Sequence, residues 1–177
     1  MILKTADNNS IEKIKDLYKR AFPLNERKPF HVIENNAAKG KSEILALYDD
    51  RFLGLVITIN HNDMVLIDYF AIEDSERGNG VGSKALKLIA ERFPEKRVFL
   101  EIELPDENAD NNVQRLRRKD FYLRNGLKET GIHVNVYHTD MELLSFTSPV
   151  TFDEYVELYK DAMGETWLKH FGRPKLI

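Results

Sequence analysis

The sequence predicts a mixed α/β fold: an α+β sheet of about seven strands with helices on both faces, followed by a C-terminal helical extension. Two observations support this class. Apolar segments of strand length alternate with segments whose apolar residues recur at helical spacing, in the order β-α-α-β-β-β-α-β-α-β-β. A strong helical pattern then resumes after residue 146. We therefore expect a domain over residues 1–146 and an extension over residues 147–177, which packs on that domain or on the second subunit of a homodimer.

In the first half of the chain, residues 1–6 are expected to form a strand. A helix follows over residues 9–22, with Asn9 as its N-cap and Glu12 three positions later. Two prolines, at positions 23 and 29, separate it from a shorter helix over residues 30–38. Residues 42–72 then indicate three antiparallel strands, with reversals at residues 49–50 and 60–63, where aspartate and asparagine favour tight turns.

In the second half, helical spacing predicts a helix over residues 82–93, and residues 97–104 read as a strand. A helix over residues 111–126 is expected to end at Gly126, before two strands within residues 127–146. Thr151 and Glu154 form a capping box for a helix in the extension that Gly164 should end, and about two further turns follow. The expected anchors of the extension are its large aromatic side chains, Tyr159, Trp167 and Phe171.

Composition excludes several classes of function. The chain has 177 residues, a net charge of −3 with both signs interleaved, and no cysteine. We therefore expect no nucleic-acid partner, no disulfide framework and no cysteine nucleophile, and the histidine spacing indicates no metal site. The N-terminus lacks the pattern of a signal peptide, and the longest apolar run, residues 53–59, is too short to span a bilayer. These features predict a cytoplasmic protein without a membrane partner.

The segment "YFAIEDSERGNGVGSKAL" is the most informative part of the chain, because glycines cluster between an apolar strand and a helix. It fails the phosphate loop pattern G-x-x-x-x-G-K-[ST] and the dinucleotide pattern G-x-G-x-x-G, but Arg77, Gly80 and Gly82 satisfy R-x-x-G-x-G. Amides at a helix N-terminus point at an anion, and glycines allow its close approach. We therefore expect a diphosphate to lie across residues 78–82; the alternative is a turn that is rich in glycine for steric reasons only.

This segment resembles the acyl-CoA motif of the GNAT superfamily of N-acyltransferases, and the expected order of elements over residues 1–146 matches that family's fold. Further along, "FYLRNGL" resembles the family's second signature, an aromatic-tyrosine pair followed by glycine and an apolar residue. The two motifs occur in the right order, about 40 residues apart.

The resemblance implies acetyl-CoA as the cofactor and two strands, over residues 65–72 and 98–104, that splay apart to hold pantetheine. The residues implied in cofactor binding are Phe70, Ala71, Ile72, Arg77, Gly78, Asn79, Gly80, Val81, Gly82 and Ser83. Many family members carry asparagine and alanine upstream of the tyrosine, where this chain has Arg115 and Arg118. Arg115 is accordingly a candidate for binding phosphate or, equally, a solvated surface charge.

Tyr122 stands where the family's general acid stands. A phenol with a pKa of about 10 can donate a proton to a departing thiolate of similar basicity. The structural alternative is an aromatic ring that packs the helix against the sheet. The resemblance also implies that a backbone amide near Ile72 polarises the thioester carbonyl.

The candidates for the general base are carboxylates in otherwise apolar strands, where an acidic residue is costly unless it faces a wet cavity or a partner. They are Asp68, Glu101 and Glu103, and Glu73 beside the loop is a further candidate for the acceptor site. Such a cluster favours a cationic acceptor. Each carboxylate also has a structural alternative, in which it holds a loop or reaches solvent.

The segment "FPLNERKPF" lies where the family places its acceptor-side loop, so Glu26 and Arg27 are candidates for contact with substrate; the alternative is an exposed turn. Together these features predict an enzyme that moves an acetyl group from acetyl-CoA to a small primary amine by direct attack in a ternary complex. Two alternatives remain: a module that binds or senses acyl-CoA without catalysis, and an acetyltransferase that acts on a protein N-terminus or lysine.

Overall fold

The computed structural model describes the backbone of all 177 residues and every side chain except those of Asn25, His170 and Phe171. Phe171, an expected anchor of the extension, therefore lies outside the described side chains. The five helices are α1 (Asn8–Ala21), α2 (Phe30–Ala38), α3 (Val81–Arg92), α4 (Asn112–Arg124) and α5 (Phe152–Phe171). The eight strands are β1 (Ile2–Thr5), β2 (Ser42–Tyr48), β3 (Phe52–His61), β4 (Met64–Ile72), β5 (Arg97–Glu103), β6 (Lys128–Val136), β7 (Thr139–Ser145) and β8 (Lys175–Leu176).

The strands form a mixed sheet in the order β1-β2-β3-β4-β5-β7-β6-β8, which confirms the predicted fold class. The chain divides into two compact units. Unit 1 comprises residues 1–60 and 67–94, and unit 2 comprises residues 61–66 and 95–177, so β4 contributes to both. The predicted boundary near residue 146 stays a prediction.

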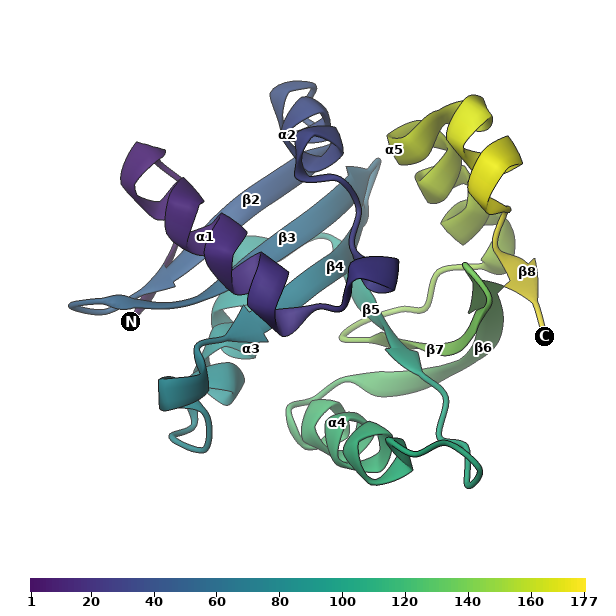
Figure 1. The fold of residues 1–177 in the computed structure, drawn as a ribbon. Helices are drawn as coiled ribbons and strands as arrows, with labels where there is room; N and C mark the ends of the chain where they lie inside the picture. Colours follow the sequence, from purple (N-terminus) through teal and green to yellow (C-terminus); the bar gives the residue numbers. More distant parts are fainter. The chain divides into compact units, whose positions relative to one another are not determined.

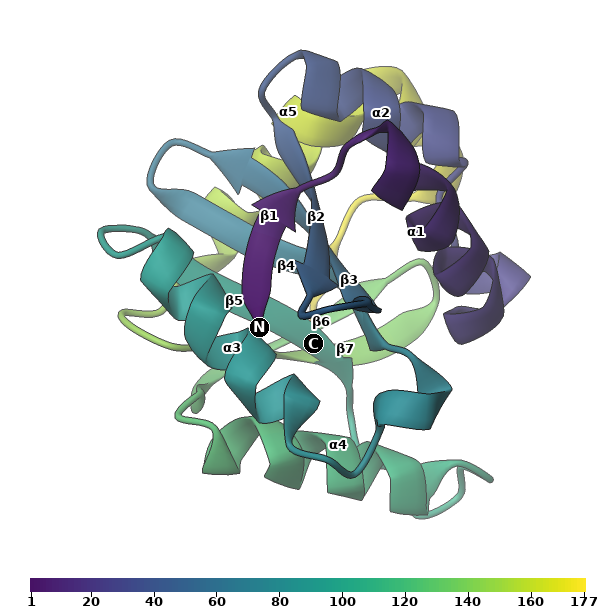
Figure 2. The same ribbon diagram turned by 90° about the vertical axis from the view of Figure 1, so that its left-hand side faces the viewer.

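In unit 1, α1 and α2 cover one face of the strands and α3 lies on the other (Figures 1 and 2). The core under α1 and α2 is continuous across three strands and includes Ile14, Leu17, Tyr18, Ile33, Leu55, Ile57 and Tyr69, each at most 6% exposed. The spacing of Ile14, Leu17 and Tyr18 gives α1 the apolar stripe that drives this packing.

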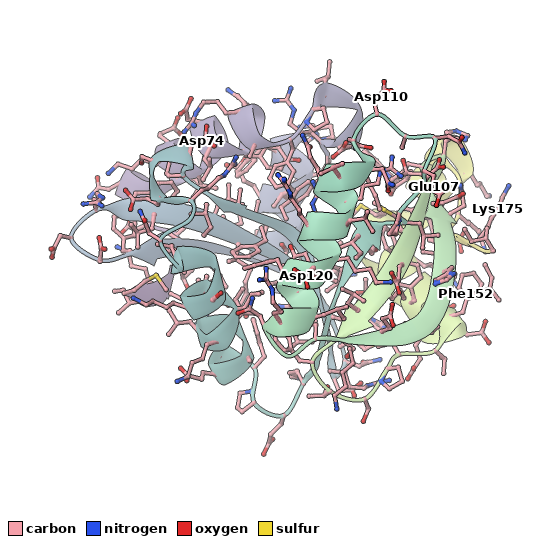
Figure 3. The ribbon with its side chains drawn as sticks, turned by 90° about the horizontal axis from the view of Figure 1, so that it is seen from below. Asp74, Glu107, Asp110, Asp120, Phe152 and Lys175 are labelled. Atoms are coloured by element: carbon pink, nitrogen blue, oxygen red, sulfur yellow. The ribbon has the colours of Figure 1, made fainter. Side chains whose placement is uncertain are left out.

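In unit 2, α4 and α5 lie on opposite sides of the strands β5, β7 and β6 (Figures 1 and 2). The two helices differ in burial. Tyr122 is the one buried residue of α4, and charged side chains such as Asp120 occupy its exposed surface (Figure 3). Tyr155, Leu158 and Tyr159 of α5 are 0–2% exposed, so α5 is an integral part of this unit.

Four local expectations need correction. The N-cap of α1 is Asp7 and not Asn9, because the Asp7 carboxylate accepts from the backbone of Asn9 and Ser10 while Ser10 closes a reciprocal capping box. The sheet has an eighth strand, β8, which at two residues is too short to show any periodicity. Gly164 does not end α5 but interrupts it, with φ 79° and ψ 158°, so the two predicted segments form one kinked helix. The expected start of α3 is displaced by one residue, to Val81.

Within the described chain, no helix combines the length and the apolar character that a membrane span requires.

Gly54 brings β3 unusually close to the end of β4. A Cβ atom built on Gly54 would lie 2.4 Å from the carbonyl oxygen of Ala71 and 3.2 Å from the Cα of Ile72. Both are backbone atoms, so no side-chain rotation could relieve the contact. The missing side chain of Gly54 therefore sets the position of the segment that the sequence assigns to pantetheine binding.

We expect Gly54→Ala to destabilise the protein by about 1–3 kcal/mol, the usual cost of forcing extra volume into a packed core. Chemical denaturation measures this change in the free energy of unfolding. An unchanged stability would mean that β3 and β4 are not held at the spacing described here.

Candidate active site

The loop before α3 has the geometry of an anion-binding site. A 3₁₀ turn, η2 (Asp74–Glu76), leads into Gly78 and Gly80, whose φ angles of 84° and 74° are left-handed. Gly80 is the N-cap of α3 and offers no side chain to the free amides. The first helical bond runs from the Lys84 amide to the Gly80 carbonyl at 3.1 Å. The amides of residues 78–83 have no acceptor within the described chain.

These amides suit a diphosphate for two reasons. A helix N-terminus carries partial positive charge, and unpartnered amides gain hydrogen bonds when an anion binds there. Side chains would not obstruct it, since a Cβ atom built at Gly78 or Gly80 meets nothing within 4 Å. The residues present therefore fit the phosphate portion of coenzyme A. Asn79, Gly80 and Ser83 are exposed, and Val81 and Gly82 are half-buried.

Arg77 is tied to the start of this loop. Its Nε donates to the carbonyl oxygen of Ile72 at 3.3 Å, and its Nη1 lies 2.9 Å from a carboxylate oxygen of Asp74. The Arg77 side chain is 59% exposed, so an incoming anion can reach it. In the adjoining end of β4, Ala71 is buried while Phe70 and Ile72 are half-buried.

The predicted acceptor-side loop is fastened to β4 through the aromatic core. The Tyr69 hydroxyl accepts from the Lys28 amide at 3.0 Å and donates to the Glu26 carbonyl at 2.9 Å. The Tyr18 hydroxyl donates to the Lys28 carbonyl at 3.0 Å. Glu26 and Arg27, which are predicted to contact substrate, therefore lie on a backbone segment that these hydrogen bonds hold in place. Glu26 is exposed, whereas Arg27 is half-buried and its Nε has no hydrogen-bond partner within the described chain.

Asp68 forms a buried ion pair with Lys28. The Lys28 Nζ lies 2.6 Å from Asp68 Oδ1, and the two side chains are only 7% and 8% exposed. Lys28 also lies 5.3 Å from the ring centroid of Tyr69. The pair thus links β4 to the acceptor-side loop, which agrees with the structural alternative for Asp68.

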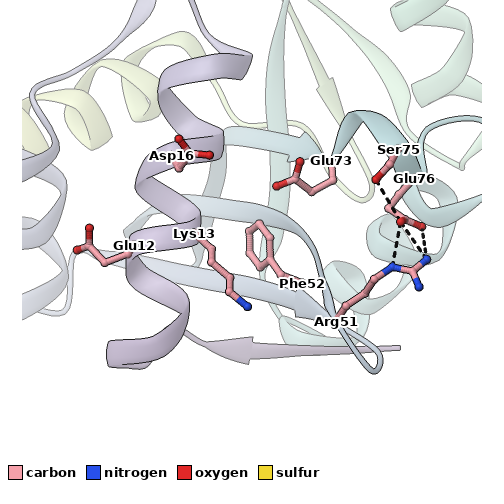
Figure 4. A pocket seen from close by; sticks show the side chains of 8 residues that line it. All are labelled: Glu12, Lys13, Asp16, Arg51, Phe52, Glu73, Ser75 and Glu76. Atoms are coloured by element: carbon pink, nitrogen blue, oxygen red, sulfur yellow. Dashed lines mark hydrogen bonds and ion pairs between the residues drawn. The ribbon is translucent and has the colours of Figure 1, made fainter.

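Glu73 lines a pocket of about 570 Å³ that opens between α1, the β2–β3 turn and η2 (Figure 4). Its other lining residues are Glu12, Lys13, Asp16, Arg51, Phe52, Ser75 and Glu76. Both oxygens of Glu73 accept from Arg20 Nη2 at 3.0 Å. Arg51 similarly bonds both oxygens of Glu76 at 3.0 Å and lowers the pKa of that carboxyl. A cationic ligand at Glu73 would therefore compete with Arg20.

Tyr122, in unit 2, is a largely buried phenol. The residue is 9% exposed, and burial raises its pKa to about 12, with a smaller opposing effect from Arg118. No described residue is a hydrogen-bond partner of its hydroxyl. The neighbouring ring of Phe121 lies 5.2 Å away, centroid to centroid. Its proton is retained at neutral pH, as a general acid requires.

The two glutamates of β5 have different partners. Glu101 Oε1 accepts from the hydroxyls of Tyr155 at 2.7 Å and Tyr159 at 2.9 Å. Glu103 instead pairs with guanidinium groups of α4, at 3.0 Å from Arg115 and 3.4 Å from Arg118. Arg115 also donates to the Leu104 carbonyl at 2.9 Å. The guanidinium of this candidate phosphate ligand is therefore already bonded to other groups of unit 2.

The site residues predicted from the sequence therefore belong to both units, and each group is described within its own unit. Unit 1 brings together the loop of residues 77–83, the end of β4 and the acceptor-side loop, while unit 2 holds Tyr122, Glu101, Glu103 and Arg115. Sequence reasoning missed Lys28, Arg20 and the hydroxyl groups of Tyr155 and Tyr159. In the sequence, Tyr155 and Tyr159 are four residues apart in an apolar helical stripe. This spacing is the signal that could have placed both hydroxyls on one face of the helix. Among the described residues, no group of three or more histidine, aspartate or glutamate side chains is arranged to hold a metal ion.

The comparisons with known proteins agree with this geometry. The sequence profile of the acetyltransferase (GNAT) family matches residues 11–118, more than half of the 177 residues. The chain belongs to the GNAT acetyltransferase family, whose members use acetyl-CoA. No curated protein sequence matches the chain significantly.

Solved structures share the fold at low sequence identity. A Bacteroides thetaiotaomicron protein assigned as a GNAT acetyltransferase has a TM-score of 0.74 and 16% identity, over 94% of this chain and 98% of that one. An aminoglycoside 6′-N-acetyltransferase complexed with coenzyme A has a TM-score of 0.62 and 15% identity, over 85% and 100% of the two chains. A Vibrio cholerae spermidine N-acetyltransferase in complex with CoA and spermine has a TM-score of 0.60 and 14% identity, over 81% and 92%.

We expect Asp68→Asn to lower the free energy of unfolding by about 3–5 kcal/mol, because it leaves the buried Lys28 ammonium without its carboxylate. The double variant Lys28→Met/Asp68→Leu should recover much of this loss, since apolar residues of similar volume replace a buried pair well. Urea denaturation measures both changes.

The matched control is Asp120→Asn, which removes one partner of an exposed ion pair with Arg124, where the side chains are 69% and 62% exposed. It should change stability by less than about 1 kcal/mol. A single Asp68→Asn variant as stable as this control would contradict the structural role of the Lys28–Asp68 pair.

Proposed function

We propose that this protein is an acetyl-CoA-dependent N-acetyltransferase that acts on a primary amine by direct attack in a ternary complex. The observation that carries the proposal is the run of amides at residues 78–83, which has no acceptor within the described chain of this GNAT family member. Bound acetyl-CoA supplies the thioester carbon and the thiolate leaving group. Direct attack is favoured because the chain has no cysteine to carry an acyl group.

In this proposal the loop binds and orients the cofactor. The amides of residues 78–83 hold the diphosphate, and Arg77 and Ser83 extend the site, since both side chains are exposed beside it. Phe70, Ala71 and Ile72 at the end of β4 pair with the pantetheine arm, and an amide near Ile72 polarises the carbonyl, as the family resemblance implies. Gly54 supports this role by fixing the end of β4.

Tyr122 is the proposed general acid. The phenol holds its proton until pH rises to about 12, so it can donate to the departing sulfur at any pH near neutral. The absence of a partner for its hydroxyl within the described chain keeps that proton available.

Glu101 is the proposed general base. An amine with a pKa of about 10.4 must lose a proton before attack, which costs about 4.6 kcal/mol at pH 7. Asp68 and Glu103 are compensated by Lys28 and by two arginines. The described donors to Glu101 are the neutral hydroxyls of Tyr155 and Tyr159, which orient its carboxylate.

The proposed acceptor is a small cationic amine. The negative charge of Glu101 supports this preference, as do two fold neighbours whose names specify aminoglycoside and spermidine acetylation. A protein N-terminus or lysine is the alternative acceptor. Glu26, Arg27 and Glu73 are proposed to contact the acceptor, with Glu73 in competition with Arg20. A cytoplasmic location and a homodimer stay predictions.

The test is an assay of CoA thiol release with a panel of polyamines, aminoglycosides, amino acids and peptides, together with calorimetry of CoA binding. We expect CoA to bind, and thiol to be released in equal amount with an N-acetylated product. Tight binding without release on any amine would favour the alternative of an acyl-CoA sensor. If calorimetry detects no heat of CoA binding, both the enzyme proposal and the sensor alternative are overturned. Because the chain has no cysteine, released thiol derives from CoA alone.

Tyr122→Phe should lower kcat at least about 100-fold, because it removes the proposed proton donor. KM for acetyl-CoA and thermal stability should change little, since the hydroxyl has no partner to lose within the described chain. Steady-state kinetics and a thermal melt measure these quantities. The control is Tyr48→Phe, on a half-buried tyrosine of β2. Equal kcat in the two variants would remove Tyr122 from the mechanism.

A further inference from the structure

Arg27, in the acceptor-side loop of unit 1, is a cation without a partner in the described chain. The residue is half-buried, and its Nε is buried with no hydrogen bond to any described residue. No ion pair joins its guanidinium to a described acid. Every other buried or half-buried lysine or arginine has a hydrogen bond or an ion pair. Arg27 is therefore the exception among the sheltered cations that the structure describes.

The backbone on both sides of Arg27 is held in place. The Tyr69 hydroxyl donates to the Glu26 carbonyl at 2.9 Å and accepts from the Lys28 amide at 3.0 Å. The Tyr18 hydroxyl donates to the Lys28 carbonyl at 3.0 Å. The rings of the two tyrosines pack edge to face with 4.8 Å between their centroids, and both residues are at most 6% exposed. Because the origin of the Arg27 side chain is fixed, little conformational entropy is lost when its guanidinium meets a ligand.

Packing of the aliphatic stem does not account for the arginine at position 27. A long cationic side chain at a protein surface buries its methylene groups and keeps its polar head in water. In Arg27 the buried atom is instead the polar Nε. A methionine would fill similar space without taking a charged group partly out of water, which is costly unless the group is paired. An anion that binds there offsets this cost, since a partly desolvated cation attracts it more strongly than a solvated one does.

A carboxylate is the anion that suits this guanidinium. Arginine donates through a planar fork, and a carboxylate can accept two parallel hydrogen bonds from it. The charges also match, because one carboxylate neutralises one guanidinium. The adjacent ammonium of Lys28 is already paired with Asp68 at 2.6 Å, so it does not supply the second cation that a phosphate dianion would need. A polyamine would instead bring like charge to Arg27.

We infer that Arg27 binds the carboxylate of an acceptor that is both an amine and an acid, namely a basic amino acid. This inference rests on the proposed function and narrows its cationic acceptor, because polyamines and aminoglycosides lack the carboxylate. In this role Arg27 determines specificity. It contacts the acceptor and takes no part in the transfer of the acetyl group or of a proton.

The test compares lysine, lysinamide and cadaverine as acceptors for the wild type, Arg27→Gln and Arg27→Lys. Lysinamide keeps the shape of lysine without the negative charge, and cadaverine is lysine without the carboxylate. In the wild type, kcat/KM for lysine should exceed that for either analogue by about 10–100-fold, as expected for a hydrogen bond between charged groups. Arg27→Gln should abolish this preference by raising KM for lysine. Arg27→Lys should keep part of it, because an ammonium carries the charge but lacks the fork.

Arg117→Gln is the matched control, since Arg117 is an exposed arginine of α4 outside the proposed site, and it should keep the preference for lysine. KM for acetyl-CoA should be the same in all variants. Thermal melts should show Arg27→Gln to be as stable as the wild type, because the guanidinium loses no hydrogen bond within the described chain.

Two results would overturn the inference and leave the acetyltransferase in place. The first is a wild type that prefers lysinamide or cadaverine, or uses them as well as lysine. The second is an Arg27→Gln variant that keeps the preference for lysine, or loses activity equally on all three amines. A wild type that releases no CoA thiol with any amine is a different result, since it removes the proposed function and this inference with it.

Discussion

A helix N-terminus whose amides find no acceptor among the described residues is the feature on which the functional interpretation depends. Left-handed Gly80 stands directly before α3 and cannot cap it, and the amides of residues 78–83 remain without partners in the described chain. Side chains cap α1 and α5, through Asp7 and Thr151, whereas α2 and α4 also lack a side-chain cap. What distinguishes the start of α3 is its pair of left-handed glycines with open space around them, which suits the acyl-CoA diphosphate that we propose there.

The three candidate carboxylates for the general base differ in their hydrogen-bond and ion-pair partners. Three acids of similar appearance in the sequence have partners of different charge: a lysine for Asp68, two arginines for Glu103 and two phenols for Glu101. A cationic partner cancels the charge and converts the acid into a structural tie. A neutral donor, such as each of the two phenols that bond Glu101, fixes the direction of the carboxylate.

The sequence predicted the fold class, the order of the elements and the glycine loop well, because these depend on local patterns. Apolar periodicity located α1 and β4, and Gly126 and Thr151 marked helix ends. It did not predict the partners of Asp68 or Glu101. Lys28 lies 40 residues from Asp68, and Tyr155 lies 54 residues from Glu101, so their contacts arise from tertiary packing. Local patterns failed at the N-cap of α1, where Asp7 and Ser10 satisfy each other, and at β8, which is too short to be recognised.

The kink at Gly164 has a consequence for the dynamics of α5. The break in the helical hydrogen-bond ladder falls between the segment with Tyr155 and Tyr159 and the segment with Trp167, whose indole donates to the Tyr137 hydroxyl at 3.1 Å. Cooperative fraying that begins at the chain end should therefore stop at residue 164. We expect slow amide exchange before the kink and faster exchange after it, which would protect the alignment of the phenols from motion at the C-terminus.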